Sequence, residues 1–143
     1  MNQEASELTP AGDELVELSI PALPELLSLP RLVAAAVAAR SGFDIEEVED
    51  VRLAIEELCL AAFEGRGAGR LRIRFGMRPK NMEVDCTFEP GDRTPGSTRP
   101  RNSIAMELTE QLLDALADEH GIDSAQGAVR AWFRKSHSDI RVE

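Results

Sequence analysis

The segment from residue 44 to residue 64 constrains the fold of this chain more than any other. Its apolar residues recur at steps of three and four, which places them on one face of a helix: Val48, Val51, Ile55, Leu58 and Ala62. Asp44 suits the N-cap of this helix, and three glycines between 65 and 69 end the pattern. A helix with one apolar face must bury that face, so the sequence predicts a second layer of structure to cover it.

Two segments that follow this helix alternate apolar and polar residues. Residues 70–75 read Arg, Leu, Arg, Ile, Arg, Phe, and residues 81–88 continue the alternation through Met82, Val84, Cys86 and Phe88. This period of two predicts strands with one face exposed to water. Because residues 79–81 (Pro, Lys, Asn) have turn chemistry, we expect the strands to form an antiparallel hairpin.

The remaining elements are predicted from shorter patterns. We expect a strand from Leu15 to Ile20, which Pro21 closes, and a helix from Pro30 to Arg40, which ends at Ser41 and Gly42. A further helix is capped by Ser103 and ends before His120 and Gly121, and a last strand spans Gly127 to Lys135. The buried face of the helix that Ser103 caps is predicted to consist of Ala105, Leu108, Leu112, Ala115 and Leu116. Trp132 is assigned to the core of the sheet.

This order of elements predicts an α+β fold. A mostly antiparallel, mixed sheet packs against helices on one face, in a two-layer sandwich. The polar residues 1–12 are expected to form a flexible arm, 13–136 a single domain and 137–143 a polar tail. Residues 89–102 contain three prolines and two glycines and are predicted to be an exposed loop.

The charge of the chain limits its partners. Its formal net charge is −10, which disfavours binding to nucleic acid or to anionic membranes and favours a basic protein partner. The sequence contains no apolar run long enough to span a membrane and no secretory signal, so we expect a cytoplasmic location. Cys59 and Cys86 lack the spacing of a metal site, and we predict two buried, reduced thiols and no bound metal.

The segment 49–63, EDVRLAIEELCLAAF, resembles the second helix of the anti-sigma factor and serine-protein kinase family, a branch of the Bergerat (GHKL, histidine-kinase-like ATPase) superfamily. The resemblance implies the histidine-kinase-like ATPase fold. In that family this helix carries a Glu that acts as catalytic base and, four residues later, an Asn that helps to hold magnesium. Here Glu57 matches the Glu and Ala61 replaces the Asn. An alanine methyl group cannot bind a cation.

The two other nucleotide-binding motifs of the family are matched by position only. Phe88 stands where the family has the Asp that binds adenine, although a shift of one or two residues would present Asp85 or Asp92 instead. Ser103 and Ala105 replace the glycines that let phosphates approach the backbone at the start of the third helix. The resemblance therefore makes ATP and magnesium possible cofactors, at a site whose motifs are degenerate.

The resemblance implies an anti-sigma regulator that sequesters a sigma factor, forms a homodimer and is relieved by an anti-anti-sigma factor. The expected contacts lie on the first and second helices. Two alternatives remain open: an active serine-protein kinase that phosphorylates the anti-anti-sigma factor with Glu57 as its base, and a regulatory binding module whose partner is not a sigma factor. Glu57 can also be read as one of six acidic residues on a solvated helix face: Glu46, Glu47, Glu49, Asp50, Glu56 and Glu57.

Overall fold

The computed structural model describes residues 14–91, 103–125 and 128–137. The described elements are β1 (Glu14–Pro21), the 3-10 turn η1 (Pro24–Leu26), α2 (Ser28–Arg40), α3 (Ile45–Phe63), β2 (Gly69–Arg78), β3 (Asn81–Pro90), α4 (Ser103–Leu116), β4 (Glu119–Ala125) and β5 (Ala128–Ser136). The predicted arm at 1–12, most of the predicted loop at 89–102 and most of the tail at 137–143 lie outside the described residues.

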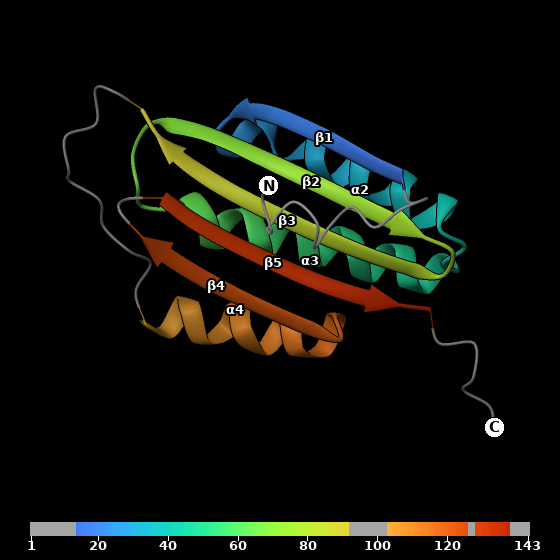
Figure 1. Cartoon of the computed structure of the whole chain (residues 1–143). Helices are drawn as coiled ribbons and strands as arrows, with labels where there is room; N and C mark the ends of the chain where they lie inside the picture. Colours follow the sequence, from blue (N-terminus) through green and yellow to red (C-terminus); the bar gives the residue numbers. More distant parts are fainter. Residues whose placement is uncertain (1–13, 92–102, 126–127, 138–143) are drawn as a thin grey trace.

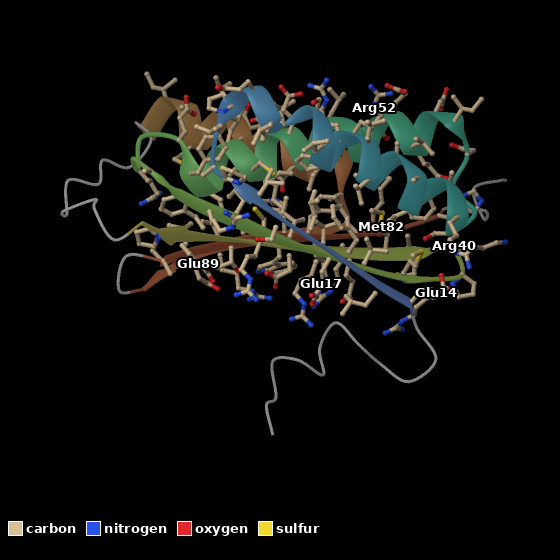
Figure 2. All side chains as sticks on the ribbon, turned by 90° about the horizontal axis from the view of Figure 1, so that it is seen from above. Glu14, Glu17, Arg40, Arg52, Met82 and Glu89 are labelled. Carbon is tan, nitrogen blue, oxygen red and sulfur yellow. The ribbon has the colours of Figure 1, made fainter. Side chains whose placement is uncertain are left out.

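The strands form one sheet in the order β1-β2-β3-β5-β4, and each described pairing is antiparallel. Figure 1 shows the helices behind this sheet, and Figure 2 shows the same two layers from above. The predicted α+β sandwich with helices on one face is confirmed. Among the described helices, none is both long enough and apolar enough to span a membrane.

The core lies between the inner face of the sheet and α3. Alternate residues of β2, β3 and β5 point to the helices and are fully buried: Leu71, Ile73, Phe75, Met82, Val84, Cys86, Phe88, Val129, Ala131 and Phe133. The predicted apolar face of α3 packs on them, with Val51, Ile55 and Leu58 fully excluded from water. Burying side chains of this size stabilises the fold by roughly 1.5–3 kcal/mol each.

Helix α3 begins with the cap that the sequence predicts. The Asp44 carboxylate accepts a hydrogen bond from the Glu47 amide (2.8 Å), and the Glu47 carboxylate accepts one from the Asp44 amide (3.0 Å). This capping box satisfies two amides that the first turn leaves without a partner.

Both cysteines are buried and unbridged, as predicted. Cys86 on β3 is hydrogen-bonded to Cys59 on α3, and this contact, together with burial, raises the pKa of the Cys86 thiol well above its usual range. Such a thiol is a poor nucleophile at neutral pH.

The first correction concerns β4, which the sequence analysis missed. His120 and Gly121 do not end the helix: α4 stops at Leu116, and both residues lie in the edge strand β4. The strand is defined by its pairing with β5. A side chain at residue 121 would collide with the Trp132 indole on β5. Gly121 thus lets Trp132 lie across β4.

The second correction concerns which residues are buried on α4 and β5. Leu108, Leu112 and Ala115 were predicted to be buried and are exposed, whereas Thr109 and Leu113 are fully buried. Trp132 was assigned to the core, but it is half-buried on the outer face of the sheet, where the Arg134 guanidinium stacks 5.0 Å from its ring centroid. Its neighbour Phe133 occupies the core.

Gly69 is the first residue of β2, and its backbone lies in close contact with residues of β3. A Cβ atom at this position would lie 2.6 Å from the Phe88 ring and would also collide with the Glu89 carbonyl oxygen. The absence of a side chain at 69 therefore allows the Phe88 ring to pack directly against the neighbouring strand.

The capping box makes a first prediction. The variant Asp44→Ala loses the acceptor for the Glu47 amide, so we expect the free energy of unfolding to fall by about 1 kcal/mol in urea denaturation. Asp44→Asn keeps an acceptor and serves as the control. An Asp44→Ala protein as stable as the wild type would show that the cap does not stabilise α3.

The contact at Gly69 makes a second prediction. Gly69→Ala is expected to lower the free energy of unfolding by more than about 2 kcal/mol, because either the Phe88 ring or the strand backbone must move. In the matched variant Gly42→Ala, the added methyl meets no atom within 4 Å, although the φ of 93° at Gly42 strains the backbone. A Gly69→Ala protein as stable as the wild type would contradict the collision at Gly69.

Candidate functional site

Glu57 lies in the middle of α3, on the side that meets α4. It is half-buried, and its carboxylate accepts a hydrogen bond of 3.1 Å from the hydroxyl group of Thr109, a fully buried residue of α4. The two helices are packed together at this level. The carboxylate that the resemblance identifies as a catalytic base is therefore held by a neighbouring helix.

Ala61 follows Glu57 by one helical turn and is buried. A four-residue step keeps both side chains on the same side of α3, so Ala61 lies beside Glu57 at the position that the resemblance assigns to a magnesium ligand. A methyl group supplies no oxygen, so Ala61 itself cannot bind a magnesium ion.

Phe88 points to the helical side of the sheet, near the end of β3. It is fully buried, belongs to the core, and packs against the backbone of Gly69. A phenyl ring cannot accept a hydrogen bond from an adenine amino group as a carboxylate does.

The shifted alignments do not restore that carboxylate among the described residues. Asp85 lies on the opposite face of the sheet, because successive side chains of a strand alternate between faces. There it accepts a hydrogen bond of 2.6 Å from Arg130 Nε. Asp92 lies outside the described residues.

The third motif lies at the start of α4. Ser103 is the first residue of this helix, and Ala105 is half-buried in its first turn, one turn before Thr109. The structure thus brings Glu57, Ala61 and the start of α4 to one region between α3 and α4, with Phe88 in the sheet core.

Thr109 is the residue of this region that sequence analysis missed. It lies four residues after Ala105 and four before Leu113, and this spacing marks the buried face of α4. The four leucines of α4 concealed this signal, since two of them point to solvent.

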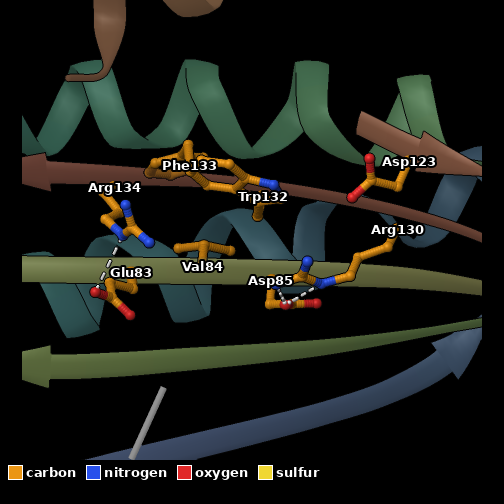
Figure 3. A pocket seen from close by; sticks show the side chains of 8 residues that line it. All are labelled: Glu83, Val84, Asp85, Asp123, Arg130, Trp132, Phe133 and Arg134. Carbon is orange, nitrogen blue, oxygen red and sulfur yellow. Dashed lines mark hydrogen bonds and ion pairs between the residues drawn. The ribbon is translucent and has the colours of Figure 1, made fainter. Parts of the chain in front are cut away.

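The outer face of the sheet holds a separate hollow of about 270 Å³, shown in Figure 3. Its walls carry the carboxylates of Glu83, Asp85 and Asp123, together with Arg130 and Arg134. Arg130 pairs with Asp85 at 2.6 Å and Arg134 with Glu83 at 3.2 Å. Because its carboxylates outnumber its guanidinium groups, this hollow does not suit a phosphate.

Within the part of the chain that the structure describes, one group of three possible metal ligands is found, at Asp44, Glu47 and His137. Both carboxylates already serve the capping box, and His137 Nδ1 lies 2.5 Å from Glu47 Oε1. A helix N-terminus also repels cations. This group therefore joins the end of β5 to the start of α3.

Comparison with known proteins identifies relatives of this chain. The histidine kinase-like ATPase domain family matches residues 20–130. The serine-protein kinase RsbW of Bacillus cereus (strain AH187) is 34% identical over 125 residues, which cover 75% of this chain and 78% of the relative. The serine-protein kinase RsbW of Bacillus subtilis (strain 168) is 27% identical over 136 residues, covering 91% and 78%.

A solved structure supports the fold. The crystal structure of the RsbU and RsbW domains of Rv1364c from Mycobacterium tuberculosis superposes with a TM-score of 0.63 at 16% identity, over 86% of this chain and 32% of that longer chain. The sequence matches and this superposition agree with the resemblance carried by residues 49–63. The chain belongs to the histidine kinase-like ATPase domain family, in its branch of anti-sigma factors and serine-protein kinases.

Proposed function

We propose that this chain regulates transcription in the cytoplasm as an anti-sigma factor, which sequesters a sigma factor by protein–protein binding and transfers no phosphate. The observation that carries the proposal is the turn of α3 that pairs Glu57 with the methyl group of Ala61. Phosphoryl transfer depends on a metal ion that neutralises the charge developing on the phosphoryl oxygens. Without a metal-binding side chain at residue 61, the Glu57 carboxylate lacks the metal ion that phosphoryl transfer requires.

The core position of Phe88 supports the same conclusion. Its ring is packed into the sheet and against Gly69, so an adenine ring that entered here would have to displace a residue of the core. Removing a buried aromatic side chain from its packing costs about 3–5 kcal/mol. That cost opposes nucleotide binding.

The binding surface for the sigma factor is proposed on α2 and α3, as the resemblance implies. Leu32 on α2 is 67% exposed, and Leu29 is also exposed, so both can serve as apolar anchors. The acidic residues of α3 steer a basic partner toward them. A homodimer, and relief by an anti-anti-sigma factor that competes for the same surface, complete the proposal.

A second candidate function is an active serine-protein kinase that phosphorylates an anti-anti-sigma factor. The specific observation in its favour is Glu57, a half-buried carboxylate at the position that the resemblance assigns to the catalytic base. The relatives named above are serine-protein kinases.

Measurements of nucleotide binding and of phosphate transfer distinguish these two functions. We expect isothermal titration calorimetry with ATP and magnesium to show no saturable binding at millimolar nucleotide. We also expect no phosphate transfer from labelled ATP to a candidate anti-anti-sigma factor, because no residue at 61 can hold the metal. The wild type and Glu57→Ala should behave alike in both measurements.

The control is Glu56→Ala, which removes a neighbouring carboxylate that pairs with Arg31 on α2. Stoichiometric transfer by the wild type and by Glu56→Ala, lost in Glu57→Ala, would establish the kinase and overturn the proposal.

Sequestration is tested by binding to purified sigma factors encoded in the same genome. We expect one of them to bind the immobilised protein. Leu32→Glu should weaken that binding at least about tenfold, because it places a charge at an apolar anchor. The association rate should fall as salt is raised, since the acidic surface steers the partner.

Arg72→Gln is the control, because Arg72 is exposed and alternates with the buried Leu71 and Ile73, which places it on the outer face of the sheet. If no sigma factor binds while another regulatory protein does, the chain is a binding module of a different class. Equal loss of binding in Leu32→Glu and Arg72→Gln would remove α2 as the contact surface.

A further inference from the structure

A second hollow lies where α2 ends and the β2–β3 hairpin turns. It has a volume of about 540 Å³ and is bordered by residues 40–42 after α2, residues 77–80 of the hairpin and Glu14 at the start of β1. Among the described residues, Glu57 and Ala61 do not line it. The hollow is therefore separate from the region between α3 and α4 described above.

The charges around this hollow have the opposite balance from those of the hollow on the outer face of the sheet. Of the described residues that line it, Arg40, Arg78 and Lys80 are basic and Glu14 is acidic. The whole chain has a net charge of −10, so the positive balance is local. A concave surface lined mainly by one sign of charge concentrates ions of the other sign. The hollow thus favours an anionic ligand.

Lys80 has a backbone conformation that favours glycine. Its φ is 60°, in the left-handed region that side chains disfavour. Two backbone hydrogen bonds hold it there: its amide donates to the Ser41 carbonyl oxygen at 2.7 Å, and its carbonyl oxygen accepts from the His137 amide at 3.0 Å. A glycine would fit this turn without strain, whereas a lysine adds a cation to the hollow. Strained residues of this kind cluster at ligand sites.

The hollow already contains one recognised carboxylate. Glu14 accepts two hydrogen bonds from Arg40, of 2.7 Å from Nε and 2.9 Å from Nη2, and Figure 2 shows the two side chains together at one end of the molecule. This bidentate pairing is the geometry in which a guanidinium group recognises a carboxylate. Both side chains are more than half exposed, so the pair contributes little stability. A ligand carboxylate can therefore replace Glu14 without loss of the fold.

The elements that supply the basic residues indicate the class of anion. Arg40 is the last residue of α2, and the carbonyl end of a helix disfavours a compact, concentrated charge such as a phosphate dianion. Arg78 and Lys80 belong to the hairpin instead. Cations on two separate elements suit a ligand whose negative charges are spread over several groups. We propose that this hollow binds a small organic acid with two or three carboxylates, one of which pairs with Arg40 in place of Glu14.

The test uses citrate as the tricarboxylate probe and follows the amide signals of the full ¹⁵N-labelled chain by NMR. We expect saturable shifts at residues 41, 42 and 80, with a Kd that rises as salt is raised. Lys80→Gly should raise the Kd at least about threefold, because one cation is lost. Its melting temperature should stay equal or rise, because glycine accepts the φ of 60°. Weaker binding without lower stability separates a binding role from a structural one.

Glu14→Gln removes the carboxylate that competes for Arg40, so it should lower the Kd at least about threefold. Arg52→Gln is the matched control, since it changes the net charge by as much as Lys80→Gly does. Arg52 pairs with Glu49 on α3 and does not line the hollow. Its Kd should stay within about twofold of the wild type.

The proposal is overturned if citrate causes no saturable shift at residues 41, 42 and 80, or if Glu14→Gln weakens binding. Equal weakening in Lys80→Gly and Arg52→Gln would also overturn it, because the net charge of the protein would then set the affinity. Inorganic phosphate that causes the same shifts at an equal or lower Kd would assign the hollow to compact anions and contradict the proposed class of ligand. None of these outcomes bears on sigma-factor binding through α2.

Discussion

The packing of α3 on the inner face of the sheet is the interaction on which the rest of the structure depends. This helix contacts α2, α4, β3 and β5, and its inward residues lie among the fully buried part of the core. Once that face is buried, the rotation of α3 about its axis is fixed. Glu57 is then directed to α4, Glu46 to solvent, and Glu47 to His137 at the end of the sheet. The position of the candidate site is thus a consequence of core packing.

The elements predicted correctly from sequence are those whose own residues determine them. Helix α3 has a capping side chain and an unbroken apolar face, and the β2–β3 hairpin has strict alternation around a short turn. The strand β4 is different, because its sequence, EHGIDSA, has a single large apolar residue. It is a strand because β5 offers it a hydrogen-bonding partner and because Gly121 leaves room for Trp132. Such non-local causes leave little trace in the segment itself.

Only part of the candidate site could be predicted, because some of its residues are placed by packing between segments far apart in the sequence. The four-residue step from Glu57 to Ala61 could be read from the helical period, and strand alternation placed Phe88 on the helical side. The partner of Glu57 could not be found, because it depends on which face of α4 is buried. Hydrophobicity favoured Leu108 and Leu112, whereas the structure buries Thr109, whose hydroxyl is hydrogen-bonded there. A buried polar residue with a partner on another helix is the case that a pattern of apolar residues cannot identify.

Charge is divided unequally between the two layers, and this division limits where a partner can bind. On the outer face of the sheet, six arginines are matched by six acidic residues, and several of them form ion pairs across strands: Arg70, Arg72, Arg74, Arg78, Arg130 and Arg134, with Glu17, Glu83, Asp85, Glu89, Glu119 and Asp123. The three α-helices instead carry nine acidic residues against three arginines.

Exposed ion pairs contribute little stability, about 0–1 kcal/mol each, so the pairing on the sheet serves mainly to cancel its field. The uncancelled negative field belongs to the helical layer, which also exposes the large aliphatic residues of α2, α3 and α4. A partner attracted by charge and held by apolar contact finds both on the helices and neither on the sheet. The proposed protein-binding surface and the turn that holds Glu57 and Ala61 therefore belong to the same layer, where a bound partner would lie beside that turn.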